Sequence, residues 1–359
     1  MSRLDPALVR GLDDRALRRV VLDDLARGVP SVGPHNVHID VINGCNAACV
    51  TCWDHSPLLE VPRPASWKRR RLPLARFHEV CDQLRDLGSV RAVVLSGMGE
   101  PLIHPDIYAM IERVKAEGWH LTVLTNLVAA DIDRFADSGV DTVLVGVQGA
   151  TPATYAAFHP GWTEQQFFTM CRYLRRLGSA GVRTRHVQVI NRDTAEEVVA
   201  MVRFGRMFRA DRVNFKLASL FAGTEACGVE PDQRDRLLRE DVPRARALAE
   251  ELGVTTNLDL FEQQLRASCG DLRATVPIES IGCSMGHVYT RITVTGDVLY
   301  CCNPKVRVGH LDDGSLADQW FGTAWQAWRD RLRRGEYPAD CDKCGKFEQN
   351  RKWAARRSS

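Results

Sequence analysis

The chain has 359 residues, of which 45% are hydrophobic and 26% are charged. This composition excludes a disordered, collagen-like or low-complexity protein, and the length suffices for one large domain or two. The formal net charge is only +3, so overall charge gives no argument for a nucleic-acid or membrane partner. No apolar run reaches the roughly 18–20 residues that a membrane span requires, and no secretory signal begins the chain, so we expect a cytoplasmic protein.

The first two thirds of the chain alternate strand and helix patterns after a helical lead-in at residues 1–35. The candidate strands are VHIDVI (37–42), AVVLSG (92–97), LTVLTN (121–126), TVLVGV (142–147), HVQVIN (186–191) and VNFKLA (213–218). Such alternation indicates parallel βα units with right-handed crossovers. We therefore predict an α/β fold in which residues 36–220 form an open, partial (β/α)6 barrel of the TIM type. The basic run 68–71 lies in a predicted loop, and we interpret it as a solvated charge cluster rather than a phosphate site.

Several of these strands alternate apolar and polar side chains, whereas a parallel strand buried on both faces is nearly all apolar. The polar residues share faces in pairs: His38 with Asp40, His186 with Gln188, and Asn214 with Lys216. If the intervening Val and Phe residues face the helices, the polar side chains face the barrel interior. Ordinary eight-stranded barrels fill that interior with branched apolar side chains. We therefore expect a wet interior that holds ligands, and polar groups satisfied within the core are the alternative.

The last part of the chain has a different character. Residues 221–270 predict a helical linker, with an amphipathic helix at 231–252. Residues 271–359 predict a small α+β domain. In it, VYTRITVTGDVLYCC indicates a hairpin with a GD turn, and a Trp-rich helix and a cysteine-bearing tail follow.

Twelve cysteines in a chain without a secretory signal indicate metal or redox chemistry more often than disulfides. Cys45, Cys49 and Cys52 follow the first strand in GCNAACVTCW. A structural zinc site usually has four ligands, so a zinc site here would need a fourth ligand from elsewhere. A cubane iron–sulfur cluster held by three cysteines would instead leave one iron free to bind another molecule.

This C-x3-C-x2-C loop after the first strand of a βα repeat resembles the radical S-adenosylmethionine (SAM) superfamily. The segment SGMGEP (96–101) closes the second strand, where that family has a GGEP-like segment that binds the methionine amino group of SAM. The matching residues are Gly97, Gly99, Glu100 and Pro101, and Met98 departs from the pattern. Glycine lets the backbone approach a ligand, and a carboxylate can pair with an ammonium group.

The resemblance also implies further cofactor contacts and a reaction. Asn126 and Gln148, at the ends of the third and fourth strands, stand where the family often contacts SAM. The family's aromatic residue before the third cysteine is replaced by Thr51, so Trp53 is the candidate for the adenine contact. In that family SAM chelates the free iron, and an electron from the cluster cleaves it to a 5′-deoxyadenosyl radical, which abstracts a hydrogen atom from substrate. A flavodoxin- or ferredoxin-type electron donor is implied as well.

A second cysteine group, Cys283, Cys301, Cys341 and Cys344, gives the spacing C-x17-C-x39-C-x2-C. Four thiolates close a site for either zinc or a fully ligated cluster, and spacing alone does not decide between them. Behind such a barrel the arrangement resembles the twitch domain, a shortened SPASM domain that holds one auxiliary [4Fe-4S] cluster. Cys302 could replace Cys301 as ligand. We prefer Cys301 because the family usually places its ligand just after such a hairpin.

The combination is similar to 2-deoxy-scyllo-inosamine dehydrogenase-type enzymes, which oxidise a secondary alcohol of an aminocyclitol. The resemblance implies oxidation of a polar, carbohydrate-like small molecule of aminoglycoside or aminocyclitol type, in antibiotic or specialised metabolite biosynthesis. The lead-in is too short for a leader-recognition domain with its own core, which also favours a small molecule over a peptide. The candidate bases, from the polar interior, are His38, His186, Lys216 and Asp40.

Other outcomes remain open at this point. An epimerase needs a thiol that returns a hydrogen atom, and Cys227 and Cys269 are the candidates, with buried core thiols as the alternative reading of both. Decarboxylation or dehydration would also follow from a carbon radical. A peptide-modifying maturase and a non-catalytic zinc-binding scaffold are hypotheses of other classes.

Overall fold

The computed structural model describes residues 3–268, 270–272 and 274–357, and its centre is one nine-stranded sheet. The strand order is β6-β5-β4-β3-β2-β1-β7-β8-β9. Neighbours from β6 to β7 are parallel, and β7–β8 and β8–β9 are antiparallel. The strands are β1 (Asn36–Ile42), β2 (Ala92–Gly97), β3 (His120–Thr125), β4 (Thr142–Gly146), β5 (Arg183–Ile190), β6 (Arg212–Leu217), β7 (Tyr289–Ile292), β8 (Asp297–Leu299) and β9 (Arg307–His310).

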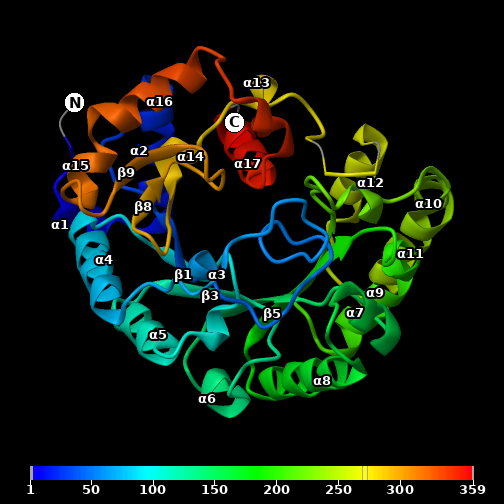
Figure 1. The fold of residues 1–359 in the computed structure, drawn as a ribbon. Helices are drawn as coiled ribbons and strands as arrows, with labels where there is room; N and C mark the ends of the chain where they lie inside the picture. Colours follow the sequence, from blue (N-terminus) through cyan, green and yellow to red (C-terminus); the bar gives the residue numbers. More distant parts are fainter. Residues whose placement is uncertain (1–2, 269, 273, 358–359) are drawn as a thin grey trace.

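The predicted partial barrel is confirmed. All six predicted strands are present as β1 to β6, parallel and in sequence order across the sheet. Helices α4 (Leu74–Leu87), α5 (Ile107–Ala116) and α8 (Glu164–Ser179) lie along the outer side of the curved sheet in Figure 1. The loop that follows β1 and the helix α17 (Phe347–Arg357) lie on its inner side (Figure 1).

The remaining helices belong to the outer layer, the connecting loops and both terminal segments. In chain order they are α1 (Pro6–Gly11), α2 (Asp14–Arg27), α3 (Ala65–Lys68), η1 (Pro101–Ile103), α6 (Ile132–Ala136), α7 (Pro152–Phe158), η2 (Ala195–Glu197), α9 (Val198–Met207), η3 (Glu225–Cys227), α10 (Pro231–Arg236), η4 (Leu237–Asp241), α11 (Val242–Leu252), α12 (Leu258–Ala267), α13 (Ile278–Ile281), α14 (Met285–Val288), α15 (Leu316–Trp320), α16 (Thr323–Arg333) and η5 (Ala339–Lys343). Within the described part of the chain, no helix combines the length and the apolar character needed to cross a bilayer.

The linker helices have their own apolar core against β6. Phe215 of β6 packs on Phe261 of α12 with ring centroids 5.8 Å apart, and the buried cluster around them includes residues of α9 and α11. The predicted helix at 231–252 is present but is interrupted by a π-helical turn, η4. Pro243 follows this turn and has no N–H to continue the regular helical hydrogen bonding.

The C-terminal strands extend the barrel sheet instead of forming a separate one. The predicted hairpin is confirmed as β7 and β8, with Gly296 of the turn at φ +89°. Its first strand pairs in parallel with β1 over four residue pairs, from Asn36–Tyr289 to Ile39–Ile292. This pairing brings the C-terminal cysteines to the side of the barrel where β1 begins the cysteine loop.

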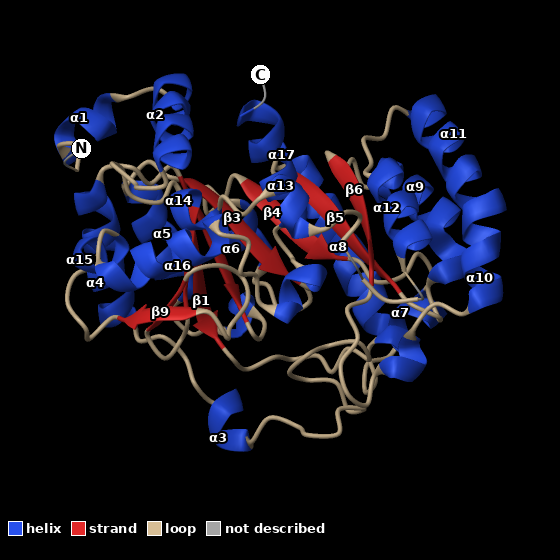
Figure 2. Ribbon diagram, turned by 90° about the horizontal axis from the view of Figure 1, so that it is seen from above, coloured by secondary structure: helices blue, strands red, loops and turns tan. Residues whose placement is uncertain are grey.

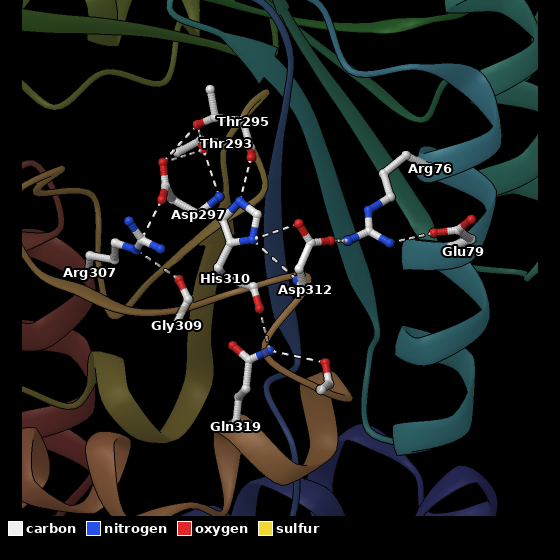
Figure 3. A network of polar contacts seen from close by, with 11 residues as sticks. Arg76, Glu79, Thr293, Thr295, Asp297, Arg307, Gly309, His310, Asp312 and Gln319 are labelled. Atoms are coloured by element: carbon white, nitrogen blue, oxygen red, sulfur yellow. Dashed lines mark hydrogen bonds and ion pairs between the residues drawn. The ribbon is translucent and has the colours of Figure 1, made fainter.

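A polar network fixes β9 and the following turn against α4 (Figure 3). Arg76 of α4 pairs with Asp312 as well as with Glu79 of its own helix. His310 of β9 bonds through Nε2 to the carbonyl oxygen of Thr295 at 2.7 Å, and its own carbonyl accepts from Gln319 at 2.7 Å. These contacts attach the C-terminal strands to the first helix of the barrel.

The start of α8 allows a quantitative test. Thr163 accepts a hydrogen bond from the backbone N–H of Gln165, and Gln166 bonds back to the N–H of Thr163 at 2.9 Å. Because Thr163→Ala removes one half of this capping box, we expect it to lower the free energy of unfolding by about 1 kcal/mol. Ser179→Ala, at the other end of the helix, should change it by no more than about 0.5 kcal/mol. Urea denaturation of both variants is the measurement, and equal effects would contradict the capping role.

Candidate active site: two cysteine groups and the barrel interior

The first cysteine group forms a tight loop at the carboxyl end of β1. The N–H of Cys52 donates to the carbonyl of Cys49 at 3.0 Å. Two sulfurs accept backbone hydrogen bonds, Cys45 from Ala47 at 3.4 Å and Cys52 from His55 at 3.3 Å. Burial, and then the neighbouring Cys52 and Cys45 thiols, raise the pKa of Cys49. The three sulfurs therefore share one poorly hydrated spot, where thiolates need a compensating positive charge such as cluster iron.

The segment SGMGEP packs directly against this loop. The N–H of Glu100 donates to the carbonyl of Gly44 at 2.8 Å. A Cβ on Gly99 would lie 1.8 Å from that same carbonyl oxygen, and a Cβ on Gly97 would lie 2.2 Å from the carbonyl of Ile42. Only glycine permits such backbone approach. Pro101 then begins the short helix η1.

Glu100 is buried and links the ends of three segments. Its carboxylate accepts hydrogen bonds from Thr125 Oγ1 at 2.5 Å, from the N–H of Asn126 at 2.7 Å and from the N–H of Leu102 at 3.0 Å. Burial raises the pKa of this carboxyl group, and those hydrogen bonds oppose the rise. Glu100 thus fixes the end of β2 to the end of β3.

The other predicted SAM contacts lie around the same loop. Asn126 donates through Nδ2 to Asn46 Oδ1 at 2.8 Å, next to Cys45. Gln148 accepts from the N–H of Val189 at 2.8 Å and so joins β4 to β5. Trp53 is 41% exposed, donates to the carbonyl of Ser219 at 3.2 Å, and has its ring 5.3 Å from that of Phe221. Contact of these residues with SAM stays a prediction.

The inner face of the sheet follows from strand register and exposure. His38 and Lys216 are partly exposed there, although the pKa of each is lowered by burial, and Asn214 shares the face. In the parallel pair β5–β6, Val187 lies beside Asn214 and Val189 beside Lys216. The residues that share the inner face with the polar side chains of β6 are therefore valines.

The expectation that His186 and Gln188 face the barrel interior is consequently wrong. Both are fully buried on the helix side, where the His186 ring lies 5.8 Å from the ring of Phe204 on α9. Among the described residues, neither imidazole nitrogen of His186 has a hydrogen-bond partner. Alternation shows that two sets of side chains face opposite ways. It does not show which set faces inward when polar residues occupy a buried face.

This burial makes His186 a source of acid sensitivity. Burial lowers its pKa to about 3, whereas the unfolded chain binds a proton below about 6.5. Stability is therefore lost as the pH falls from 6.5 towards 3, by up to about 1.4 kcal/mol per pH unit. The free energy of unfolding of His186→Leu, relative to that of wild type, should rise by about 2 kcal/mol when the pH is lowered from 7 to 5. Urea denaturation at both pH values is the measurement. Gln188→Leu, its non-titrating neighbour, should show a pH-independent difference. A pH-independent difference for His186→Leu would contradict the assignment.

Arg291 is a site residue that sequence reasoning missed. It comes from β7, is 8% exposed, and pairs with fully buried Asp40 at 2.8 and 3.1 Å. The same guanidinium donates to the sulfur of Met98 at 3.4 Å and to the carbonyl of Cys302 at 3.4 Å. It therefore bridges the SGMGEP segment and the second cysteine group. The sequence feature that could have indicated such a residue is Asp40, because a buried carboxylate in a strand needs a cationic partner.

The second cysteine group contains five thiols instead of the four expected. The Cys302 thiol is hydrogen-bonded to both Cys301 and Cys344, and those bonds lower its pKa. Burial raises the pKa of Cys283 to about 12 and that of Cys341 to about 11, and both thiols are within electrostatic reach of Cys302. A partly buried set of neighbouring thiols suits an iron–sulfur cluster. Cys301 as the fourth ligand stays a prediction, since Cys302 lies equally among the others.

Of the two thiols proposed as hydrogen donors, the structure describes Cys227, which belongs to neither cysteine group. Cys227 is 3% exposed, its sulfur is 3.9 Å from the carbonyl of Val50, and it packs in a small apolar cluster with Val50 and Phe158. This is the position of a buried core thiol behind the cysteine loop. Cys269 lies outside the described residues. Across residues 3–268, 270–272 and 274–357, no group of three or more His, Cys, Asp or Glu side chains is arranged to hold a single metal ion.

Comparison with known proteins identifies two regions of the chain. Residues 39–205 match the radical SAM superfamily, and residues 283–345 match SPASM, an iron–sulfur cluster-binding domain. These domains bind SAM, a [4Fe-4S] cluster with an open iron and auxiliary iron–sulfur clusters, which the two thiol groups fit.

Individual relatives are distant. Pre-heme d1 synthase of Dinoroseobacter shibae is 29% identical over 130 residues, which are 35% of this chain and 29% of that protein. The chain thus spans less than a third of that relative. A tungsten-containing aldehyde ferredoxin oxidoreductase cofactor-modifying protein of Pyrococcus furiosus is 18% identical over 326 residues, 86% of each chain.

Among solved structures, Streptococcus suis SuiB bound to its precursor peptide SuiA superposes with a TM-score of 0.63 and 18% identity. The superposition covers 92% of this chain and 74% of SuiB, and it shows a shared fold. The two domain matches and the geometry of the thiol groups lead to one conclusion: the chain carries a radical SAM domain over residues 39–205 and a C-terminal SPASM domain over residues 283–345.

Proposed function

We propose that the protein oxidises a secondary alcohol of a polar, carbohydrate-like small molecule to a ketone, in the biosynthesis of an aminoglycoside, an aminocyclitol or a related specialised metabolite. One observation carries the proposal: Lys216, on the inner face of the barrel, is within electrostatic reach of Cys302 and Cys344 in the second cysteine group. An electron acceptor would therefore lie beside the place where a substrate radical forms.

When bound, SAM and the reduced cluster supply a 5′-deoxyadenosyl radical, which takes the hydrogen atom from the alcohol carbon. The carbon radical then becomes a ketone by losing one electron and the hydroxyl proton. An auxiliary cluster, which Cys283, Cys341, Cys344 and either Cys301 or Cys302 would hold, would supply the acceptor for that electron. Lys216 accepts the proton in this proposal, because burial lowers its pKa and so favours the neutral amine.

Polar side chains near the second cysteine group suit a hydroxyl- and amine-bearing substrate. Lys346 lies over the ring of Tyr289, with Nζ 4.3 Å from the ring centroid, and the ring of His38 lies 5.5 Å from that of Tyr289. Asn214 adds an amide on the same face as Lys216. These groups can donate hydrogen bonds to substrate oxygens. The proposal also includes a cytoplasmic flavodoxin- or ferredoxin-type electron donor.

The test is an anaerobic assay of the reconstituted enzyme in heavy water with candidate aminocyclitols. We expect 5′-deoxyadenosine and a carbonyl product in equal amounts. Deuterium at the reacting carbon without a carbonyl would mean epimerisation and would overturn the proposal. Lys216→Met should retain both clusters and SAM binding and should lose most of the ketone formation.

Peptide modification is the second candidate, and a specific surface favours it. Four large apolar side chains are exposed on the loop after the first cysteine group and on the loop after β6: Trp53, Leu58, Val61 and Phe221. The two loops are joined by the hydrogen bond from the N–H of Glu60 to the carbonyl of Ala222. SuiB, which shares the fold, was solved with a precursor peptide. Formation of 5′-deoxyadenosine with peptides and not with aminocyclitols would select this candidate.

A further inference from the structure

The basic run Lys68–Arg71 has no role in the chemistry described above. Arg69, Arg70 and Arg71 are exposed and Lys68 is half-buried. Within the part of the chain that the structure describes, none of these four side chains takes part in an ion pair or a hydrogen bond. Figure 2 shows α3, which ends at Lys68, set apart from the other helices on a long loop. The run is thus four adjacent positive charges that are available to a partner.

The backbone of this run is fixed against the start of the cysteine loop. The N–H of Asn43 donates to the carbonyl of Arg70 at 3.0 Å, and the N–H of Leu72 donates to the carbonyl of Val41 at 2.8 Å. Ile42 and Arg71 form an antiparallel bridge. A hydrogen bond thus joins the run to Asn43, two residues before Cys45.

Side chains fix the preceding residue, Trp67, in the same way. The Asn43 side chain donates to the carbonyl of Trp67 at 3.2 Å. The guanidinium of Arg63 lies 5.0 Å from the Trp67 ring centroid, and the ring of His55 lies 6.0 Å away. The charged side chains therefore project from a backbone whose position relative to the cysteines is set.

The run and the first cysteine group open onto one surface. A depression of about 590 Å³ is lined by both Cys45 and the basic run, through Lys68 and Arg69, with Trp162 completing the wall. A protein seated over these charges would lie against a ligand of the cluster that must receive the electron. Positive surface charge attracts acidic partners and speeds their association by about 10- to 1000-fold.

We propose that Lys68–Arg71 is the docking surface for an acidic one-electron carrier protein of the flavodoxin or ferredoxin type. The inference rests on the electron donor of the proposed function and not on its substrate. One electron leaves the reduced carrier and enters the cluster held by Cys45, Cys49 and Cys52. No bond forms or breaks, and no proton is transferred.

The test measures electron transfer without any substrate. The variant Lys68→Glu/Arg69→Glu/Arg70→Glu changes side chains only, whereas the contacts that hold this segment are made by its backbone. The matched control, Arg203→Glu/Arg206→Glu/Arg244→Glu, makes the same change in net charge at exposed positions on α9 and α11. Iron and sulfide content must equal wild type in both. Stopped-flow absorbance then follows reduction of the cluster by a reduced acidic flavodoxin and, separately, by dithionite.

We expect the Lys68 variant to be reduced by flavodoxin about tenfold or more slowly at low salt, with the dithionite rate unchanged. The wild-type flavodoxin rate should fall as salt is added, and that of the variant should not. An unchanged flavodoxin rate would overturn the proposal. So would equal slowing of the control variant or equal slowing with dithionite. Failure of the alcohol-oxidation proposal would leave these rates untouched, because no substrate is present.

Discussion

Arg291→Met should lower the free energy of unfolding by about 3–5 kcal/mol. The substitution leaves Asp40, which is fully buried, without the guanidinium that contacts it at 2.8 and 3.1 Å. Among the residues that the structure describes, Ser96 is then the one remaining donor to this carboxylate, at 3.2 Å. Removing one partner of a buried ion pair costs much more than removing both, because a lone charge remains in a poorly polarisable surrounding. Burial already raises the pKa of Asp40, and Arg291 opposes that rise.

The matched control is the double variant Arg291→Met/Asp40→Leu. It removes the stranded carboxylate and should recover a large part of the lost stability in urea denaturation. If the single and double variants were equally unstable, the loss would come from packing rather than from an unpaired charge. Arg291 also donates to Met98 and to the carbonyl of Cys302, so the single variant should in addition lose iron from one of the cluster sites.

Gly99→Ala should abolish most of the SAM cleavage, by about a hundredfold or more. The new Cβ would lie 1.8 Å from the carbonyl oxygen of Gly44 and 2.6 Å from that of Asn43, and both are backbone atoms that cannot move without the loop. The loop carries Cys45, and a displacement of about 1 Å at a reacting centre costs about a hundredfold in rate.

Iron and sulfide analysis should show that Gly99→Ala keeps the auxiliary cluster and loses the first one. Gly178→Ala is the control, because its Cβ would meet only the carbonyl of Phe208, at 4.0 Å. Position 178 lies within α8, where alanine is more favourable than glycine. Full iron content and normal formation of 5′-deoxyadenosine by Gly99→Ala would show that the close approach at Gly44 does not constrain the site.

Sequence patterns predicted the barrel because its signals are local. Six short strands separated by helices are recognisable within windows of a few residues. Glycine is required at positions 97 and 99 because the backbone of another segment lies against each of them. The position of the first cysteine group beside SGMGEP follows from parallel topology, since the carboxyl ends of β1 and β2 meet at one edge.

The parts that could not be predicted depend on contacts between distant segments. Arg291 and Asp40 are 251 residues apart, and no local pattern relates them. The inward face of β5 is set by its register with β6, which places Val187 beside Asn214, and not by the polarity of His186. The hairpin at 289–299 was recognisable from its turn, whereas its parallel pairing with β1 required the assembled sheet.

The pairing of β7 with β1 holds the two redox sites at a fixed distance from each other. The first cysteine group follows β1, and Cys301 and Cys302 of the second group follow β8, which pairs with β7, so one hydrogen-bonded ladder joins the two sites. Electron tunnelling weakens steeply with separation, and a shared ladder keeps that separation the same from one turnover to the next. The loops that carry Trp53 and Phe221 lie outside this ladder, so they can move while the spacing of the redox sites stays constant.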